Sequence, residues 1–228
     1  MLYIRKANER GHANHGWLDS YHTFSFANYY DPKFMGFSDL RVINEDRVIA
    51  GEGFGTHPHK DMEILSYVLS GTIAHKDSMG NVKTLPAGEF QIMSAGTGVT
   101  HSEYNYGDDE LHFLQIWIVP NELGVTPRYD QKAFANQQGG TLILSPTAEN
   151  DSFKIYQDMK LWRYQYDKNS NEIIELNNNR NYWLQIVKGH LNINGQTVQA
   201  GDGVALSQEN VLDVVANDDS EFLLFDLR

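Results

Sequence analysis

The sequence of 228 residues contains no cysteine. Disulfides, thiolate metal sites and thiol catalysis are therefore excluded, and any bound metal must be held by nitrogen and oxygen ligands. Long apolar runs are also missing. The first residues lack the hydrophobic segment of a signal peptide, and no later stretch is long enough to span a bilayer. From these absences we expect a cytoplasmic protein with no membrane contact.

Positive charge is scarce as well. Lys and Arg number 18 against 30 Asp and Glu, which gives a formal net charge of −12, and no basic cluster interrupts this acidic balance. Because an acidic surface repels a phosphate backbone, direct nucleic-acid binding is not expected. The composition still suits a globular protein, since 41% of the residues are hydrophobic.

Strand-like segments dominate the chain, and none has the long apolar stripe and caps of a helix. Four segments are rich in aliphatic and aromatic residues and are bounded by turn-forming residues: 63–69, 112–119, 161–166 and 182–187. Asn194-Gly195 separates two alternating segments, which predicts a hairpin with a type I′ turn because both central residues need positive φ. We expect an all-β fold with a few short helices.

An internal repeat divides the chain. The order strand, Gly turn, strand, hairpin and small-Gly-acidic turn occurs around Gly71 and again around Gly189. Similarity at half the chain length indicates two copies of one β-domain. We place them at 1–130 and 131–228, with the boundary in the polar, loop-like stretch 129–141. The N-terminal strand is a candidate partner for the second copy.

Two short motifs carry the chemistry of the chain. His57-Pro58-His59 and His101-Ser102-Glu103 each place two potential metal ligands two residues apart. Residues i and i+2 of a strand point to the same face, so each motif can aim both ligands at one point. Two neighbouring strands would then offer three imidazoles and one carboxylate to a single divalent cation. Such a donor set suits Fe, Ni, Mn, Cu, Co or Zn.

The second copy lacks these ligands. Counted from the repeated glycines, the corresponding positions hold Glu175, Asn177, Val214 and Ala216. We therefore expect one metal site, in the first half only.

The ligand motifs belong to a longer pattern. Gly51, His57-Pro58-His59, Glu63 and Gly71 follow the spacing of the first cupin motif. The second motif begins at Gly80 but has Gln91 in place of its histidine, and His101 and Glu103 follow instead. This departure, together with the segments 16–26, 39–46 and 53–59, resembles the pirin family. The resemblance extends to about Pro127, and the second half fits the family plan more loosely.

The resemblance implies a bicupin, with two cupin barrels packed face to face, of which only the first holds a metal, most often Fe(II). It implies His57, His59, His101 and Glu103 as ligands. Glu63 would lie behind them. The partners of the second ring nitrogens stay open among Glu63, Gln91 and Gln115.

Two functions are compatible with this resemblance. Bacterial relatives are associated with quercetin 2,3-dioxygenase activity, which opens the heterocycle of a flavonol with O2. Eukaryotic relatives are iron-dependent coregulators, so the alternative is a non-catalytic protein whose metal redox state controls binding to a protein partner. A monomer is expected, since two barrels in one chain cover each other's faces.

For the enzymatic function, Glu103 is the candidate catalytic base, because a flavonol binds a metal as its anion and must lose a proton. The planar substrate requires an apolar, aromatic wall. We expect it to be formed by His22, Phe24, Phe26, Phe54, Met62, Phe90 and Met93. For the aromatic run 24–30, however, a role in the core and as a cover of the barrel is favoured over a substrate wall, and His22 could instead fix the N-terminal segment. The remaining histidines are expected to be exposed (His12, His15) or structural (His75, His112, His190).

Overall fold

The computed structural model describes residues 1–228, which form two compact units built almost entirely of strands. The first unit, here called the first barrel, comprises Gly11–Phe134 and Ile155–Gln157. The second barrel comprises Met1–Arg10, Ala135–Lys154 and Asp158–Arg228. Two 3₁₀ turns, η1 (Ala7–Glu9) and η2 (Glu149–Asp151), are the only helices. Neither is long and apolar enough to cross a membrane.

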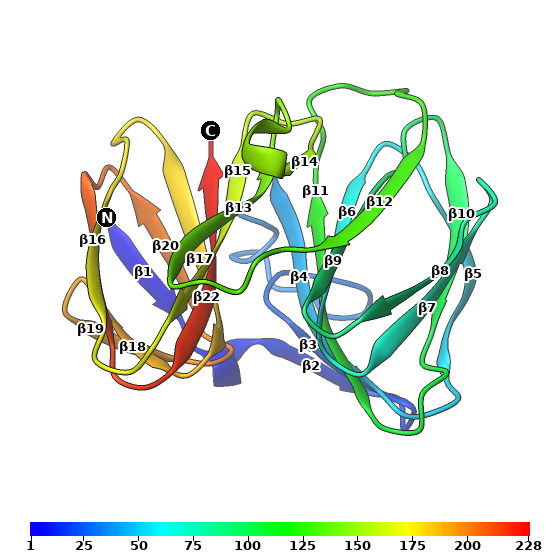
Figure 1. The fold of residues 1–228 in the computed structure, drawn as a ribbon, viewed down its shortest axis with the longest axis horizontal. Coiled ribbons are helices and arrows are strands. Elements are labelled where there is room, and N and C mark those ends of the chain that lie inside the picture. Colours follow the sequence, from blue (N-terminus) through cyan, green and yellow to red (C-terminus); the bar gives the residue numbers. More distant parts are fainter. The chain divides into compact units, whose positions relative to one another are not determined.

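Two antiparallel sheets make up the first barrel (Figure 1). The larger sheet has the order β12-β9-β6-β11-β4-β3-β2. Its strands are β2 (Gly11–Asn14), β3 (Leu18–His22), β4 (Leu40–Val48), β6 (Glu63–Ser70), β9 (Glu89–Ser94), β11 (Leu111–Ile118) and β12 (Arg128–Ala133). The smaller sheet has the order β5-β10-β7-β8. Its strands are β5 (Gly53–His59), β7 (Thr72–Asp77), β8 (Val82–Pro86) and β10 (Val99–Tyr104).

The core of the first barrel lies between these sheets. Leu18 and Phe113 of the larger sheet pack with Ile73 and Leu85 of the smaller one in a single buried cluster. Side chains alternate between the two faces of a strand, so β10 buries Val99, His101 and Glu103 while the residues between them are more exposed. The same alternation that builds the core therefore turns two polar side chains toward the interior.

The second barrel repeats this plan. One sheet has the order β1-β20-β17-β22-β15-β13-β14 and the other β16-β21-β18-β19, which parallels β5-β10-β7-β8 of the first barrel. Its strands are β1 (Leu2–Arg5), β13 (Gly139–Ser145), β14 (Phe153–Lys154), β15 (Lys160–Tyr166), β16 (Asn171–Glu175), β17 (Asn181–Lys188), β18 (His190–Ile193), β19 (Gln196–Gln199), β20 (Gly203–Ser207), β21 (Val211–Ala216) and β22 (Ser220–Leu227). The N-terminal strand β1 pairs with β20.

The interior of the second barrel is apolar. A buried cluster of aliphatic and aromatic side chains fills it, and Val214 and Ala216 of β21 belong to that cluster. Val214 stands opposite Ile193 of β18, as Glu103 stands opposite His75 of β7. The second barrel thus uses as packing the positions that the first barrel uses for polar side chains.

The prediction of an all-β bicupin is confirmed. Each of the four strongly apolar segments forms a strand, namely β6, β11, β15 and β17. The predicted hairpin joins β18 to β19, and its central residues Asn194 and Gly195 have φ values of 48° and 81°. The stretch 129–141, predicted to be loop-like, instead contains β12, which pairs with β9. As an edge strand, β12 can keep polar side chains such as Asp130 in solvent, and this weakens its sequence signal.

Candidate metal centre

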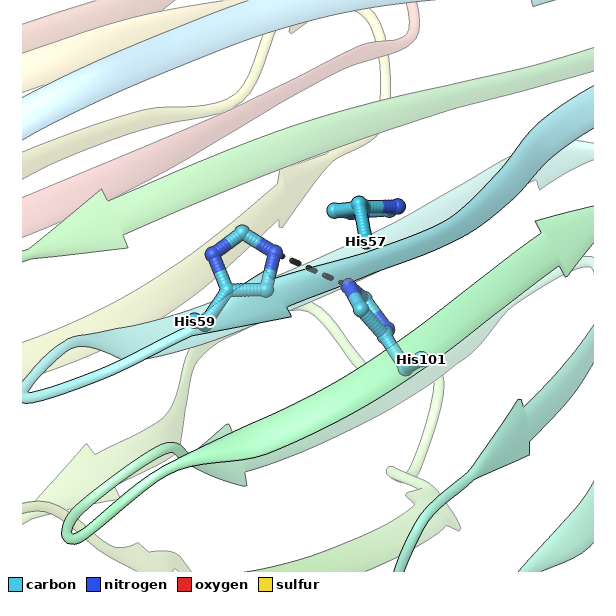
Figure 2. A group of neighbouring side chains, drawn as sticks. All are labelled: His57, His59 and His101. Carbon is cyan, nitrogen blue, oxygen red and sulfur yellow. Dashed lines mark hydrogen bonds between the residues drawn. The ribbon is translucent and has the colours of Figure 1, made fainter.

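Three imidazoles from two neighbouring strands converge in the first barrel. His57 and His59 lie on the same side of β5, and His101 extends from β10, which pairs with β5 so that His101 stands opposite His57 (Figure 2). The ring centroids are 4.5 to 4.9 Å apart. One nitrogen from each ring can be chosen so that all three lie within 4.8 Å of one another. The i, i+2 spacing therefore produces the convergence that it predicts.

The protonation state of these rings suits a metal. His57 Nδ1 lies 2.7 Å from the Gly55 carbonyl oxygen, to which a ring N–H donates, so Nε2 keeps its lone pair. The Nε2 atoms of His59 and His101 lie 3.0 Å apart. Burial, with repulsion from the neighbouring imidazoles, lowers the pKa of His59 to about 4 and of His101 to about 3. Both rings are thus neutral at pH 7, which is the form that binds metals.

Glu103 lies beside His101, in a second group that also contains His75 and overlaps the first at His101. Its carboxylate is buried and accepts three hydrogen bonds. Gln91 Nε2 and Ser66 Oγ donate to Oε1 over 3.0 and 3.3 Å, and Gln115 Nε2 donates to Oε2 over 3.2 Å. These donors fix the orientation of the carboxylate next to His101.

Gln91 and Gln115 therefore contact Glu103 rather than a ring nitrogen. Glu63 is occupied elsewhere in the first barrel. It accepts a hydrogen bond from Ser94 Oγ at 3.0 Å and forms an ion pair with Arg128 at 3.6 Å. Burial raises the pKa of Glu63 above its ordinary value. None of its contacts reaches the three histidines.

His75, for which a structural role is expected, lies beside the centre. Its Nε2 lies 2.9 Å from Asp77 Oδ2, while its buried Nδ1 and the buried Nδ1 of His101 have no hydrogen-bond partner. β7 pairs with β10 so that Asp77 stands opposite His101 and His75 opposite Glu103. A sequence signal was present, because His75 and Asp77 have the same i, i+2 spacing as the two ligand motifs.

A cavity of about 450 Å³ opens beside the histidines, with His57 and His59 on its wall. Of the residues expected to form the substrate pocket, His22, Phe26 and Phe54 line it. The other four do not line it. Phe24 is 1% exposed, Met62 and Met93 pack in a cluster around Ile64, and Phe90 stacks on Tyr67 at a centroid distance of 3.9 Å.

Further aromatic residues complete the cavity. Tyr29 and Trp117 line it, and the Trp117 ring stands edge-on to His59 at 5.1 Å and to Phe26 at 5.4 Å. Trp117 is two residues from Gln115 on β11, so strand alternation places both on the inner face. His12 and His15, exposed as expected, also belong to the lining.

One wall of the cavity is polar. β3 and β4 pair so that Ser20 stands opposite Asp46 and His22 opposite Asn44. The Ser20 hydroxyl donates a hydrogen bond to Asp46 Oδ1, and His22 Nδ1 lies 2.9 Å from Asn44 Oδ1. Burial raises the pKa of Asp46 to about 7 despite the hydrogen bond from Ser20. A sequence signal was present here too, because Asn44 and Asp46 have the i, i+2 spacing of the ligand motifs.

Two β-barrels of repeated topology, with a histidine cluster in the first alone, define a bicupin with one candidate metal centre. The sequence matches the Pirin family model over residues 3–118 and the model for the quercetinase C-terminal cupin domain over residues 142–227. The chain belongs to the pirin family.

Close relatives are known from Escherichia coli. The chain is 60% identical to a protein of strain K12 named quercetin 2,3-dioxygenase, over 100% of this chain and 99% of the relative. A crystal structure of the E. coli bacterial pirin YhhW in complex with nickel(II) superposes with a TM-score of 0.97, at 60% identity and over 100% and 99% of the two chains.

A more distant structure shares the fold. A quercetin 2,3-dioxygenase from Acinetobacter baumannii has a TM-score of 0.78 at 17% identity, over 100% of this chain and 79% of that one. At this sequence identity the structural similarity shows a shared fold only.

Proposed function

We propose that this chain is a metal-dependent dioxygenase that opens the heterocycle of a flavonol such as quercetin with O2. The observation that carries the proposal is the convergence of three imidazoles, two of which, those of His57 and His59, lie on the wall of an aromatic-lined cavity. The name of the E. coli relative, at 60% identity over the full chain, supports the substrate and the reaction.

His57, His59, His101 and Glu103 are the proposed ligands. Neutral imidazoles and a carboxylate fit a divalent transition metal, and the absence of sulfur ligands disfavours soft metals. The nickel complex of the E. coli pirin supports a metal at such a centre, and Fe(II) is the ion proposed here. When bound, the metal supplies Lewis acidity and a path for electrons between the flavonol anion and O2.

The cavity suits a planar aromatic substrate. Phe26, Phe54 and Trp117 offer apolar ring faces and edges, against which a fused ring system can pack without loss of hydrogen bonds. A cavity of about 450 Å³ lies within the usual size range of small-molecule sites. These walls orient the substrate and exclude water from the reacting atoms.

Glu103 is the proposed base. Its Oε1 already accepts two hydrogen bonds, whereas Oε2 accepts one, from Gln115. Oε2 therefore has a lone pair free for the proton of the flavonol hydroxyl. Loss of that proton creates the electron-rich anion that reacts with O2. Both oxygen atoms of O2 then enter the product, and one ring carbon leaves as carbon monoxide.

The test is aerobic turnover of quercetin by iron-loaded protein, followed by absorbance and by release of carbon monoxide. The His57→Ala variant should lose turnover, because it removes one imidazole without touching the core. His190→Ala is the matched control, since His190 is an exposed histidine of the second barrel. Full turnover by His57→Ala, or consumption of quercetin without O2, would contradict the proposal.

A further inference from the structure

The polar wall of the cavity, formed by Ser20, His22, Asn44 and Asp46, has no role in holding the metal. These four side chains are buried on the inner faces of β3 and β4 and line the same cavity as His57 and His59. Cores avoid such groups unless they are fully hydrogen-bonded, because desolvation of a polar atom costs free energy. A polar wall in an otherwise aromatic cavity therefore calls for a ligand that pairs with it.

Asp46 is the member of this wall with unused hydrogen-bonding capacity. Its carboxyl is 2% exposed, and its only hydrogen bond is the one that Oδ1 accepts from Ser20. It is also the only carboxyl group among the residues that line the cavity. A buried carboxyl with one partner leaves Oδ2 without any, and Oδ2 can gain that partner from a molecule bound in the cavity.

We propose that Asp46 is a specificity-determining residue that binds a hydroxyl group of the substrate other than the hydroxyl–carbonyl pair that chelates the metal. The inference rests on the proposed function for the orientation of the substrate. It extends that function by assigning the cavity a preference for polyhydroxylated aromatic rings over bare ones.

A hydroxyl group is the ligand chemistry that fits. The near-neutral pKa of Asp46 makes both its ionised and its protonated form accessible under ordinary conditions. A phenolic hydroxyl donates to the first form and accepts from the second, so it pairs with either. An anionic ligand group would be repelled by the ionised form. The aromatic residues that surround the wall then pack against the ring that carries the hydroxyl.

The experiment compares two flavonols in anaerobic binding titrations of the metal-loaded protein. Quercetin carries hydroxyls around its rings, whereas 3-hydroxyflavone keeps only the chelating pair. The wild type should bind quercetin more tightly. Asp46→Asn should weaken quercetin binding by about tenfold, the size expected for one hydrogen bond to a charged group, and should leave 3-hydroxyflavone within about twofold.

Glu45→Gln is the matched control. Glu45 is adjacent to Asp46 on β4 but lies on the other face, where it contacts His112 and Arg47. This variant should keep the quercetin preference of the wild type. Metal content and melting temperature are measured for every variant, so that loss of the metal or of the fold is recognised.

Ser20→Ala provides a second test that does not depend on the folding of Asp46→Asn. It leaves the carboxyl in place but removes its protein partner, so the preference for quercetin should increase. An unchanged or reduced preference overturns the inference. So does an Asp46→Asn protein that weakens both flavonols equally, or a wild type that binds both equally.

Turnover, measured separately, distinguishes this inference from the proposed function. A wild type that shows the Asp46-dependent preference yet consumes no quercetin in air would refute the dioxygenase and leave the hydroxyl subsite in place.

Discussion

The hydrogen bond from Gln115 to Glu103 should control metal affinity more strongly than any other contact behind the ligands. Gln115 Nε2 is the only donor to Glu103 Oε2, at 3.2 Å, and Glu103 is 2% exposed, so water has little access to replace it. Gln115→Leu therefore leaves one carboxylate oxygen without its fixed donor in a buried site. Hydrogen bonds to charged groups contribute about 1.5–3 kcal/mol.

That energy corresponds to a loss of about 10- to 100-fold in metal affinity, the range observed when groups behind metal ligands are removed. Gln91→Leu should cost less affinity, because Oε1 keeps the hydrogen bond from Ser66 at 3.3 Å. It should cost more stability, since Gln91 also donates to Ser66 and accepts from Tyr129. The structure thus predicts opposite rankings of these two variants in the two measurements.

Competition with a chelator of known affinity, under anaerobic conditions with Fe(II) and in air with Ni(II), measures the first quantity. Urea unfolding of the metal-free protein measures the second. Gln185→Leu is the matched control, because Gln185 is a buried glutamine of the second barrel and donates to backbone carbonyls. It should lower stability and leave metal affinity unchanged. Wild-type affinity in Gln115→Leu, or a larger loss in Gln91→Leu, would refute the reasoning.

Three further predictions concern stability. The folded-state pKa of Asp46 is raised to about 7 from 3.8. The protonated carboxyl therefore contributes its full share to the free energy of unfolding below pH 4, and this contribution is lost as the pH rises through 7. In urea unfolding at pH 4–8, the free energy of unfolding of Asp46→Asn should increase relative to that of the wild type as the pH rises. Hydrogen bonds from His190 lower the pKa of Asp218 to about 2, so in thermal unfolding Asp218→Asn should reduce stability at pH 5 and should reduce it less as the pH falls to 2. Phe113→Ala empties a fully buried position in the first barrel and should cost about 3–5 kcal/mol in urea unfolding.

The sequence predicts the strands of this protein where both faces are buried. β6 and β17 consist of near-continuous apolar runs because they lie centrally in their sheets, so their signal is strong. The edge strand β12 was missed because none of its residues is buried. Local hydrophobic periodicity follows from burial, and fewer side chains are buried in an edge strand than in a central one.

The candidate site shows the same limit. The i, i+2 spacing of His57 and His59 is a local property, and it predicts their convergence directly. Asp46 and Trp117 reach the cavity only through the pairing of β4 with β11, which depends on the register of distant strands. Four aromatic or sulfur-containing candidates were placed in the pocket by residue type alone, and Phe24 and Phe90 show that type does not distinguish a cavity wall from a packed core.

The strand pairings of the second barrel show what a metal site requires beyond its ligands. β21 pairs with β16 so that Val214 stands opposite Glu172, whereas Glu175 stands opposite Val211. The residues found by counting from the repeated glycines are thus three residues out of register, whereas in the first barrel His101 stands directly opposite His57. Exchanging them for histidines and a carboxylate would not bring the ligands together. Rebuilding a binding centre there would first require positions chosen by strand pairing rather than by their distance from a repeated glycine.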